Sequence, residues 1–456
     1  MLTRHVLTRL ALFGAGCVLA TAPFVEPLHA LPAASERPKN VIVLIGDGMG
    51  YNHIASASLY EHGVAYKQVT GTPGAVREVR GTAAYAFEDF PVQLDVSTFW
   101  SEGSYDPARA WTDFDYVRKN PTDSAAAATA MATGHKTYKG GIGVDAEGRE
   151  VQNVSERALS LGKAAGVVSS VQFSHATPAS WTAHDADRDH YLAIAHDQVT
   201  SDLTVVMGAG HPFHNRNGTP RETPRYRYIS EDDFTALASG STGFELVESR
   251  ADFESLATGA TPKRVFGIAQ VSKTLQQARS GASPAPHDAP FTERVPALET
   301  MTRGALNVLD NDPDGFSLMV EGGAIDWAGA ANQRARAIEE TMEFTKAVDA
   351  VVHWVETNSS WDETLVIVTA DHETGYLGGV EADPAWTPLA GGAGKVPSGA
   401  WQSGSHTNQL VPLYANGAGA GTLRTLATGD DPVRGDYLDN TDLGRLVLEK
   451  LWPARR

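Results

Sequence analysis

Short apolar runs rich in β-branched residues, separated by longer stretches with helical periodicity, constrain the fold of this chain most. Residues 40–46 (NVIVLIG) are apolar after Asn40 and end in glycine, which is typical of a strand buried on both faces. Similar runs occupy residues 167–173, 203–207, 264–268, 316–320 and 364–369, and a long amphipathic stretch with a Glu-rich face covers residues 332–356. The alternation predicts an α/β fold: a mostly parallel central sheet with helices on both faces.

The first thirty residues have the features of an export signal. Two arginines precede an apolar run over residues 10–22, and a small-residue cleavage pattern ends at Ala30. The run is shorter than the roughly 20 residues that cross a bilayer, although a buried N-terminal helix is an alternative. The only cysteine, Cys17, lacks the leucine of a lipoprotein signal three residues before it. We therefore predict a signal peptide over residues 1–30, export to the periplasm or the extracellular space, and no stable membrane anchor.

The charge and composition of the chain exclude two broad classes of protein. The chain has 37 Lys and Arg against 55 Asp and Glu, which gives a formal net charge of −18. Nucleic acid repels such a surface, so a nucleic-acid partner is not expected. With 42% hydrophobic and 20% charged residues, the chain can bury a large core and is not a disordered protein.

Candidate ligand residues follow several of the predicted strands. Asp47 comes directly after the first strand, Glu321 ends another, and Asp371 and His372 follow a third, while His175 follows the run at 167–173. Ligands bind beyond the carboxyl ends of parallel strands, so these side chains can converge. Carboxylates mixed with imidazoles suit zinc and magnesium. A helix cap or a surface ion pair would explain any one of these acids, but not the recurring placement.

A candidate nucleophile, Ser124, lies at the start of an alanine-rich stretch. Alanine favours helix, and a serine at this place is expected to be the N-cap residue, which could be its whole role. A helix N-terminus also carries free N–H groups and a partial positive charge, so it can hold a phosphate. No serine–base pair is evident nearby, which leaves a metal ion as the activator.

The motifs around these residues resemble those of alkaline phosphatases and occur in the same order. They are Gly46-Asp-Gly-Met-Gly50, Thr122-Asp-Ser-Ala-Ala126, His175-Ala-Thr-Pro-Ala179 with Arg188 downstream, Glu321-Gly-Gly-Ala-Ile-Asp326, Thr369-Ala-Asp-His372 and His406-Thr407. The resemblance covers residues 40–416 and implies one domain over residues 31–456. Ranges rich in Gly, Pro and Ser, at about residues 71–107, 208–262 and 378–404, are interpreted as surface insertions.

The resemblance also implies a role for each site residue. Ser124 would be the nucleophile, Arg188 would clamp the phosphate, and Asp123 would orient the arginine. Two zinc ions and one magnesium ion are implied. One zinc would bind Asp47, Asp371 and His372, and the other would bind Asp326 and His406. Magnesium would bind Asp47, Thr177 and Glu321, with His175 acting behind these ligands or through water.

The sequence departs from the family pattern beside the site. His175 stands where the best-known enteric bacterial enzyme has an aspartate, and Trp327 stands in place of a lysine. More seriously, Ala330 occupies the position of a usual zinc-binding histidine, and a methyl group has no lone pair. Gln333, His184 and His190 are the nearest candidates for a replacement, and none is convincing from sequence.

The resemblance implies a metal-dependent phosphomonoesterase that hydrolyses small phosphate monoesters through a phosphoserine, with a homodimer left open. A phosphodiesterase or related ester hydrolase of the same superfamily is one alternative. The other is a catalytically weak protein that binds metal and phosphate, because Ala330 removes a ligand.

Overall fold

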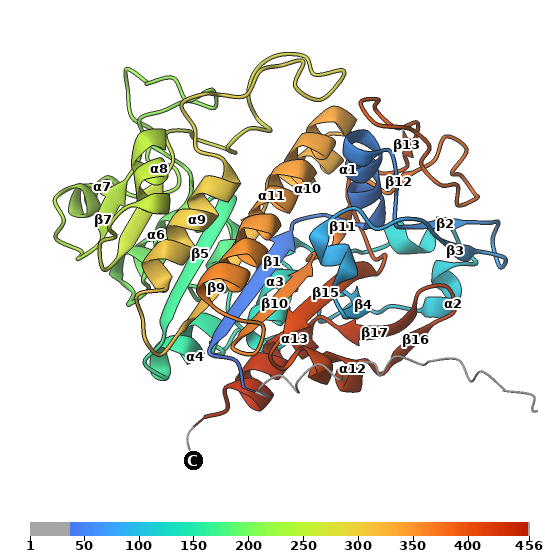
Figure 1. The fold of residues 1–456 in the computed structure, drawn as a ribbon, viewed down its shortest axis with the longest axis horizontal. Helices are drawn as coiled ribbons and strands as arrows, with labels where there is room; N and C mark the ends of the chain where they lie inside the picture. Colours follow the sequence, from blue (N-terminus) through green and yellow to red (C-terminus); the bar gives the residue numbers. More distant parts are fainter. Residues whose placement is uncertain (1–36, 455–456) are drawn as a thin grey trace, which may run out of the picture. The chain divides into compact units, whose positions relative to one another are not determined.

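The computed structural model describes residues 37–454, which build a central eleven-stranded sheet with helices on both faces (Figure 1). In order across the sheet the strands are β16 (Gly429–Asp431), β17 (Gly435–Asp439), β4 (Val92–Ser97), β15 (Val411–Gly417), β10 (Thr364–Thr369), β1 (Asn40–Gly46), β9 (Phe316–Gly322), β5 (Ala164–Gln172), β6 (Val205–Ala209), β8 (Val265–Ile268) and β7 (Glu245–Val247). From β10 to β7 all neighbours are parallel, whereas β15 is antiparallel to both of its neighbours. The predicted α/β class is confirmed.

Two layers of helices cover the sheet. On the face nearest the viewer in Figure 1 lie α1 (Tyr51–His62), α8 (Arg250–Thr258), α9 (Leu298–Leu309) and α11 (Arg334–Asn358). On the other face lie α3 (Ser124–Thr133), α4 (Val154–Ser160), α5 (Ala176–Ser180) and α13 (Thr441–Arg445). The remaining α-helices are α2 (Pro107–Ala110), α6 (Tyr191–Thr200), α7 (Glu231–Ala238), α10 (Ala324–Ala330) and α12 (Leu423–Leu426). No helix within residues 37–454 is both long and apolar enough to cross a bilayer.

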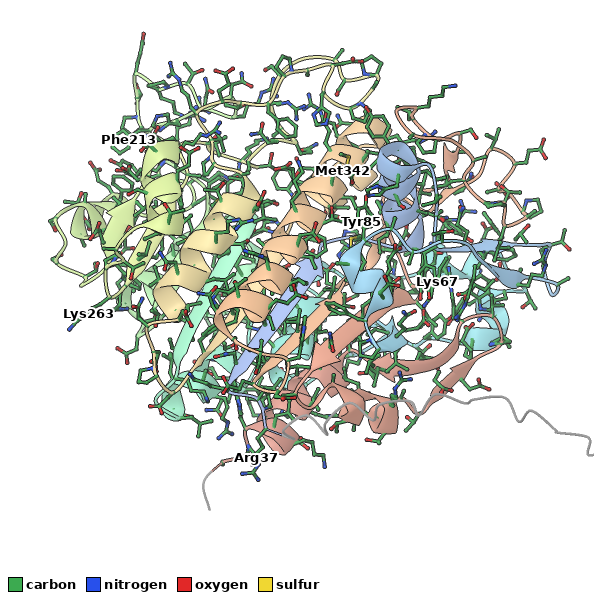
Figure 2. The ribbon with its side chains drawn as sticks, in the orientation of Figure 1. Arg37, Lys67, Tyr85, Phe213, Lys263 and Met342 are labelled. Atoms are coloured by element: carbon green, nitrogen blue, oxygen red, sulfur yellow. The ribbon has the colours of Figure 1, made fainter. Side chains whose placement is uncertain are left out.

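A hydrophobic core fills the space between the sheet and these layers. Every residue of β1 is buried, as its unbroken apolar pattern predicts. Met342 of α11 and Tyr85, both labelled in Figure 2, are buried members of the same cluster. The core packs against the strands, and the candidate site is built on their ends.

Three short ribbons lie outside the central sheet. They pair β2 (Lys67–Thr70) with β3 (Arg77–Arg80), β11 (Glu373–Thr374) with β14 (His406–Thr407), and β12 (Leu377–Gly378) with β13 (Ala400–Trp401). The ribbon of β11 and β14 follows directly after β10. It therefore brings His406, far along the chain, back to the end of the sheet.

Two of the ranges expected to be surface insertions contribute strands to the sheet. Residues 71–107 contain β4, and residues 208–262 contain β7 together with α7 and α8. Turn-forming residues around these strands hide their pattern in the sequence. The domain limits remain predictions, and the predicted signal over residues 1–30 lies outside the described part of the chain.

Candidate active site

The carboxyl ends of β1, β9 and β10 bring the candidate ligands together. Asp47 follows β1, Glu321 is the last residue but one of β9, and Asp371 and His372 come shortly after β10. Three groups of side chains each place their ligand atoms within 4.8 Å of one another. The groups are Asp47 with Asp371 and His372, Asp326 with His372 and His406, and Asp47 with His175 and Glu321. Convergence of these residues at one edge of the sheet follows the sequence prediction.

The first group contains two buried carboxylates with too few hydrogen-bond donors around them. Asp47, Asp371 and His372 have no exposed surface, and both carboxylate oxygens of Asp47 and Oδ2 of Asp371 lack a hydrogen bond. Burial raises the pKa of Asp371 to about 7. Burial, together with the charges of Asp371 and Asp326, raises the pKa of Asp47 well above its usual value. Buried carboxylates normally have a donor or a cation, so this donor set fits a divalent metal.

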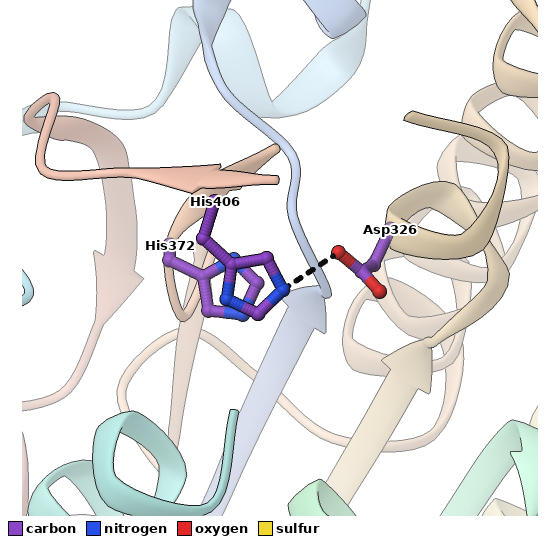
Figure 3. A group of neighbouring side chains, drawn as sticks. All are labelled: Asp326, His372 and His406. Carbon is purple, nitrogen blue, oxygen red and sulfur yellow. Dashed lines mark ion pairs between the residues drawn. The ribbon is translucent and has the colours of Figure 1, made fainter. Parts of the chain in front are cut away.

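The second group contains two stacked imidazoles facing a carboxylate (Figure 3). The ring centroids of His372 and His406 are 3.6 Å apart, and His406 Nε2 lies 3.2 Å from Asp326 Oδ1. His406 Nδ1 donates to the Thr122 carbonyl at 2.9 Å, so Nε2 is the atom that can bind a metal once it has lost its proton. This is the usual way in which a protein orients a metal-binding histidine.

The charges of this second group are strongly coupled. Burial lowers the pKa of His406, but the hydrogen bond and the charge of Asp326 outweigh burial and raise that pKa to about 9. Burial alone would raise the pKa of Asp326, but the hydrogen bond and the charge of His406 hold it well below its usual value. A metal ion would replace the proton of His406 as the partner of this carboxylate.

The third group surrounds Glu321. Its Oε2 accepts a short hydrogen bond from Ser169, its Oε1 is unpartnered, and burial raises its pKa to about 7. Thr177 is fully buried, and its hydroxyl has no hydrogen-bond partner. His175 accepts from Arg188 Nη2 at 3.4 Å, and burial and the Arg188 charge lower its pKa to about 3. Unpartnered oxygens beside a neutral imidazole fit a hard cation held partly through water.

Ser124 lies beside the first group at the start of α3. Its Oγ is 3.3 Å from His372 Nε2, and only 2% of its surface is exposed. The expectation that Ser124 is the N-cap residue is wrong: Asp123 occupies that place, and its Oδ1 accepts from Ala126 N at 3.0 Å. A carboxylate caps the helix as well as a hydroxyl does, and this leaves the Ser124 hydroxyl free for chemistry.

Asp123 also positions Arg188. Arg188 Nη1 donates to Asp123 Oδ2 at 3.1 Å, and Gly140 N donates to the same oxygen at 3.1 Å. One carboxylate therefore caps the helix that begins at Ser124 with one oxygen and holds the arginine with the other. The contact places Asp123 against Arg188, and the orienting role of Asp123 stays a prediction.

The side chains considered as replacements for a ligand at Ala330 are engaged elsewhere. Gln333 accepts from Gln277 at 3.0 Å and precedes α11. His184 lies between the Gly143 carbonyl and Glu156, and His190 pairs with Asp185. Among residues 37–454, the candidate group around Asp326 thus consists of Asp326, His406 and the shared His372.

Sequence reasoning missed two buried residues near Asp326. Thr374 has no exposed surface and donates a hydrogen bond of 2.6 Å to Asp326 Oδ1. His53 is also buried; its Nδ1 accepts from Gly50 N, and its Nε2 has no partner. Burial lowers the pKa of His53 to about 4 although Asp326 opposes the shift. The position of Thr374 two residues after His372 was the available signal, but a threonine in a strand is unremarkable by itself.

Comparison with known proteins assigns the chain to a family. The model of the family described as "Alkaline phosphatase" matches residues 38–427. The chain belongs to the alkaline phosphatase family. Alkaline phosphatase 3 of Bacillus subtilis is 32% identical over 343 residues, which are 74% of this chain and 61% of that protein. The alkaline phosphatase of Escherichia coli K12 is 29% identical over 374 residues, covering 74% of this chain and 71% of that protein.

Solved structures of alkaline phosphatases share the fold. The enzyme of the Antarctic bacterium TAB5 is 24% identical, covers 92% of this chain and 100% of its own, and superposes with a TM-score of 0.62. The Thermus thermophilus enzyme is 21% identical, with 93% of each chain covered and a TM-score of 0.65. The alkaline-phosphatase-like architecture expected from the motifs is therefore confirmed.

Proposed function

We propose that this protein is a metal-dependent phosphomonoesterase that acts through a phosphorylated Ser124. The observation that carries the proposal is the position of the Ser124 hydroxyl, 3.3 Å from His372 Nε2 at the start of α3. Around it lie buried carboxylate oxygens without partners and an arginine fixed by Asp123. Family membership supports phosphate ester hydrolysis. In this proposal Ser124 would be the nucleophile, Arg188 would bind the phosphate, and the clustered carboxylates and histidines would hold the metals.

Two zinc ions and one magnesium ion are the proposed cofactors. Asp47, Asp371 and His372 would hold one zinc, Asp326 and His406 would hold the second, and Asp47, Thr177 and Glu321 would hold magnesium. When bound, the metals would lower the pKa of an attacking oxygen and neutralise charge on the entering and leaving oxygens. A solved variant of the TAB5 enzyme holds magnesium in a site called M3, which supports a hard-cation site in this family.

The residues of the chain would bind and orient the substrate. The Ser124 oxygen would attack phosphorus and displace the alcohol of the ester, and water would then attack the phosphoserine to release phosphate and regenerate Ser124. Free N–H groups at the start of α3 would face the phosphoryl oxygens. Arg188 offers a planar pair of donors that can meet two phosphoryl oxygens at once. Because Asp123 fixes Arg188, the guanidinium would reach the phosphate with little loss of side-chain entropy. A terminal phosphate has three free oxygens for these donors, whereas a diester has two.

Substrate attraction must be local in this proposal. The chain as a whole carries a charge of −18, which repels anionic substrates. Arg188 and the metals would provide the positive field at the site. Small phosphate monoesters are the proposed substrates, export is part of the proposal, and a homodimer is left open.

Hydrolysis of a chromogenic monoester and of the matching diester, with zinc and magnesium supplied, tests the proposal. We expect the monoester to be preferred, and we expect Ser124→Ala to lose turnover by several orders of magnitude while remaining folded. Brief incubation with labelled phosphate, acid quenching and peptide mapping should place the label on Ser124. A strong diester preference would support the related ester hydrolase instead. Equal turnover by the Ser124→Ala variant would favour the metal- and phosphate-binding protein.

A further inference from the structure

We propose that Thr374 is a positioning residue that couples the two neighbouring metal sites, so that it controls the metal affinity of both without being a ligand of either. The inference rests on the proposed metal-dependent function and goes beyond it. It assigns a role to a residue that the catalytic scheme does not use.

The Thr374 hydroxyl bridges the two groups of ligands. It donates to Asp326 Oδ1 at 2.6 Å, and it lies 3.3 Å from His372 Nδ1. Since the hydroxyl proton is directed to the carboxylate, His372 Nδ1 must be the donor in the second contact. His372 is then the tautomer with its lone pair on Nε2, the atom that faces Asp47 at 3.5 Å and Asp371 at 3.2 Å.

The backbone of Thr374 positions His406, the third member of the second group. In the ribbon of β11 and β14, Thr374 is paired directly with His406. Thr374 thus contacts Asp326 and His372 through its side chain and His406 through its strand. A shift of any one of these residues on metal binding is transmitted to the other two.

Gly48 keeps the hydroxyl in this position. Its carbonyl accepts from Thr374 N at 3.0 Å, and its N–H donates to Asp371 Oδ1 at 3.0 Å. A Cβ at Gly48 would lie 2.7 Å from the Thr374 hydroxyl and 2.8 Å from the Asp326 Cα, and its φ of 72° also disfavours a side chain. The loop after β1 therefore fixes Asp371 and Thr374 together.

The alanine at 330 makes this positioning more important. The proposed second zinc site has only Asp326 and His406 as ligands that it does not share with the first site. Its affinity therefore depends strongly on the direction of the Asp326 carboxylate. Partners that orient metal ligands typically change metal affinity by about 10–100-fold. A single hydroxyl that orients ligands of both sites should therefore affect both affinities.

Zinc titration of the metal-free protein against a chromophoric chelator tests the coupling. His406→Ala, which removes a ligand from the Asp326 site alone, identifies which of the two dissociation constants belongs to that site. We expect Thr374→Val to weaken both zinc sites by about 10–100-fold, and Thr374→Ser, which keeps the hydroxyl, to restore both. Circular dichroism of the metal-free variants establishes that they are folded.

Thr407→Val is the matched control. Thr407 is equally buried, lies in the same ribbon and bonds Glu373, which belongs to none of the three groups. We expect this variant to keep the wild-type zinc affinities. Unchanged affinities in Thr374→Val, or weakening at one site alone, would overturn the coupling. Wild-type protein that binds no zinc would instead overturn the proposed function.

Discussion

The variant Ala330→His tests whether the candidate site around Asp326 lacks a ligand. Ala330 is the last residue of α10 and follows Asp326 by four residues, so the two positions share a helix face. Ala330 is exposed, so the larger side chain has room. Ala330→His should therefore add an imidazole next to the carboxylate.

The size of the gain can be bounded from the ligands already present. Residues that only orient a metal ligand change metal affinity by about 10–100-fold, and a direct ligand should matter at least as much. The expected gain is thus about 1.4–2.8 kcal/mol, at 1.4 kcal/mol for each factor of ten. The gain should appear at one zinc site, because the side chain at 330 is not next to Asp47 or Asp371 in the groups described above.

Zinc affinity and zinc activation measure this gain. We expect Ala330→His to lower both the dissociation constant of the weaker site and the zinc concentration that gives half-maximal activity. Ala330→Leu fills similar space without a lone pair and should change neither. If the histidine variant matched the wild type in both quantities, another ligand would already occupy the position and the reasoning would fail.

Two further predictions concern the stability of the scaffold, and urea unfolding measures both. Glu339 and Arg279 form an almost fully buried ion pair at 2.8 Å, so Glu339→Ala should lower the free energy of unfolding by about 3–5 kcal/mol. Glu299→Ala, which removes a surface ion pair, should lower it by less than about 1 kcal/mol. Similar losses in the two variants would contradict the burial argument. The hydrogen bond to Glu156 raises the pKa of His184 from 6.5 to about 9, so its contribution is complete below pH 6.5 and is lost as the pH rises through 9. Because Glu156 is partly exposed, we expect the free energy of unfolding to fall by only about 1 kcal/mol between these pH values, and we expect no such fall in His184→Gln. If the variant had the same pH dependence as the wild type, other groups would be its cause.

The centre of the sheet could be predicted from the sequence because its strands are buried on both faces. Residues 40–46 and 364–369 match the observed β1 and β10, since an unbroken apolar run has no other stable environment in a chain of this composition. The edge was not predictable in the same way. β16 and β17 are short and mostly polar, and their pairing depends on contacts with distant strands rather than on a local pattern.

In the site too, some features could be predicted from the residue types and others depend on three-dimensional contacts. A single carboxylate after a buried strand, such as Asp47, could be a helix cap or part of an ion pair. Only the recurrence of acids and histidines at the ends of several strands predicts a group of ligands. The choice between Asp123 and Ser124 as helix cap depends on side-chain direction, because both residue types cap helices well. Thr374 is harder still, because a buried threonine acquires its meaning only when Asp326 and His372 are seen on either side of its hydroxyl. Residues that orient ligands are therefore found by identifying the acceptor of each buried hydroxyl proton. For Thr374 the acceptor is the Asp326 carboxylate, and the same hydroxyl contacts His372, which belongs to the neighbouring candidate metal site.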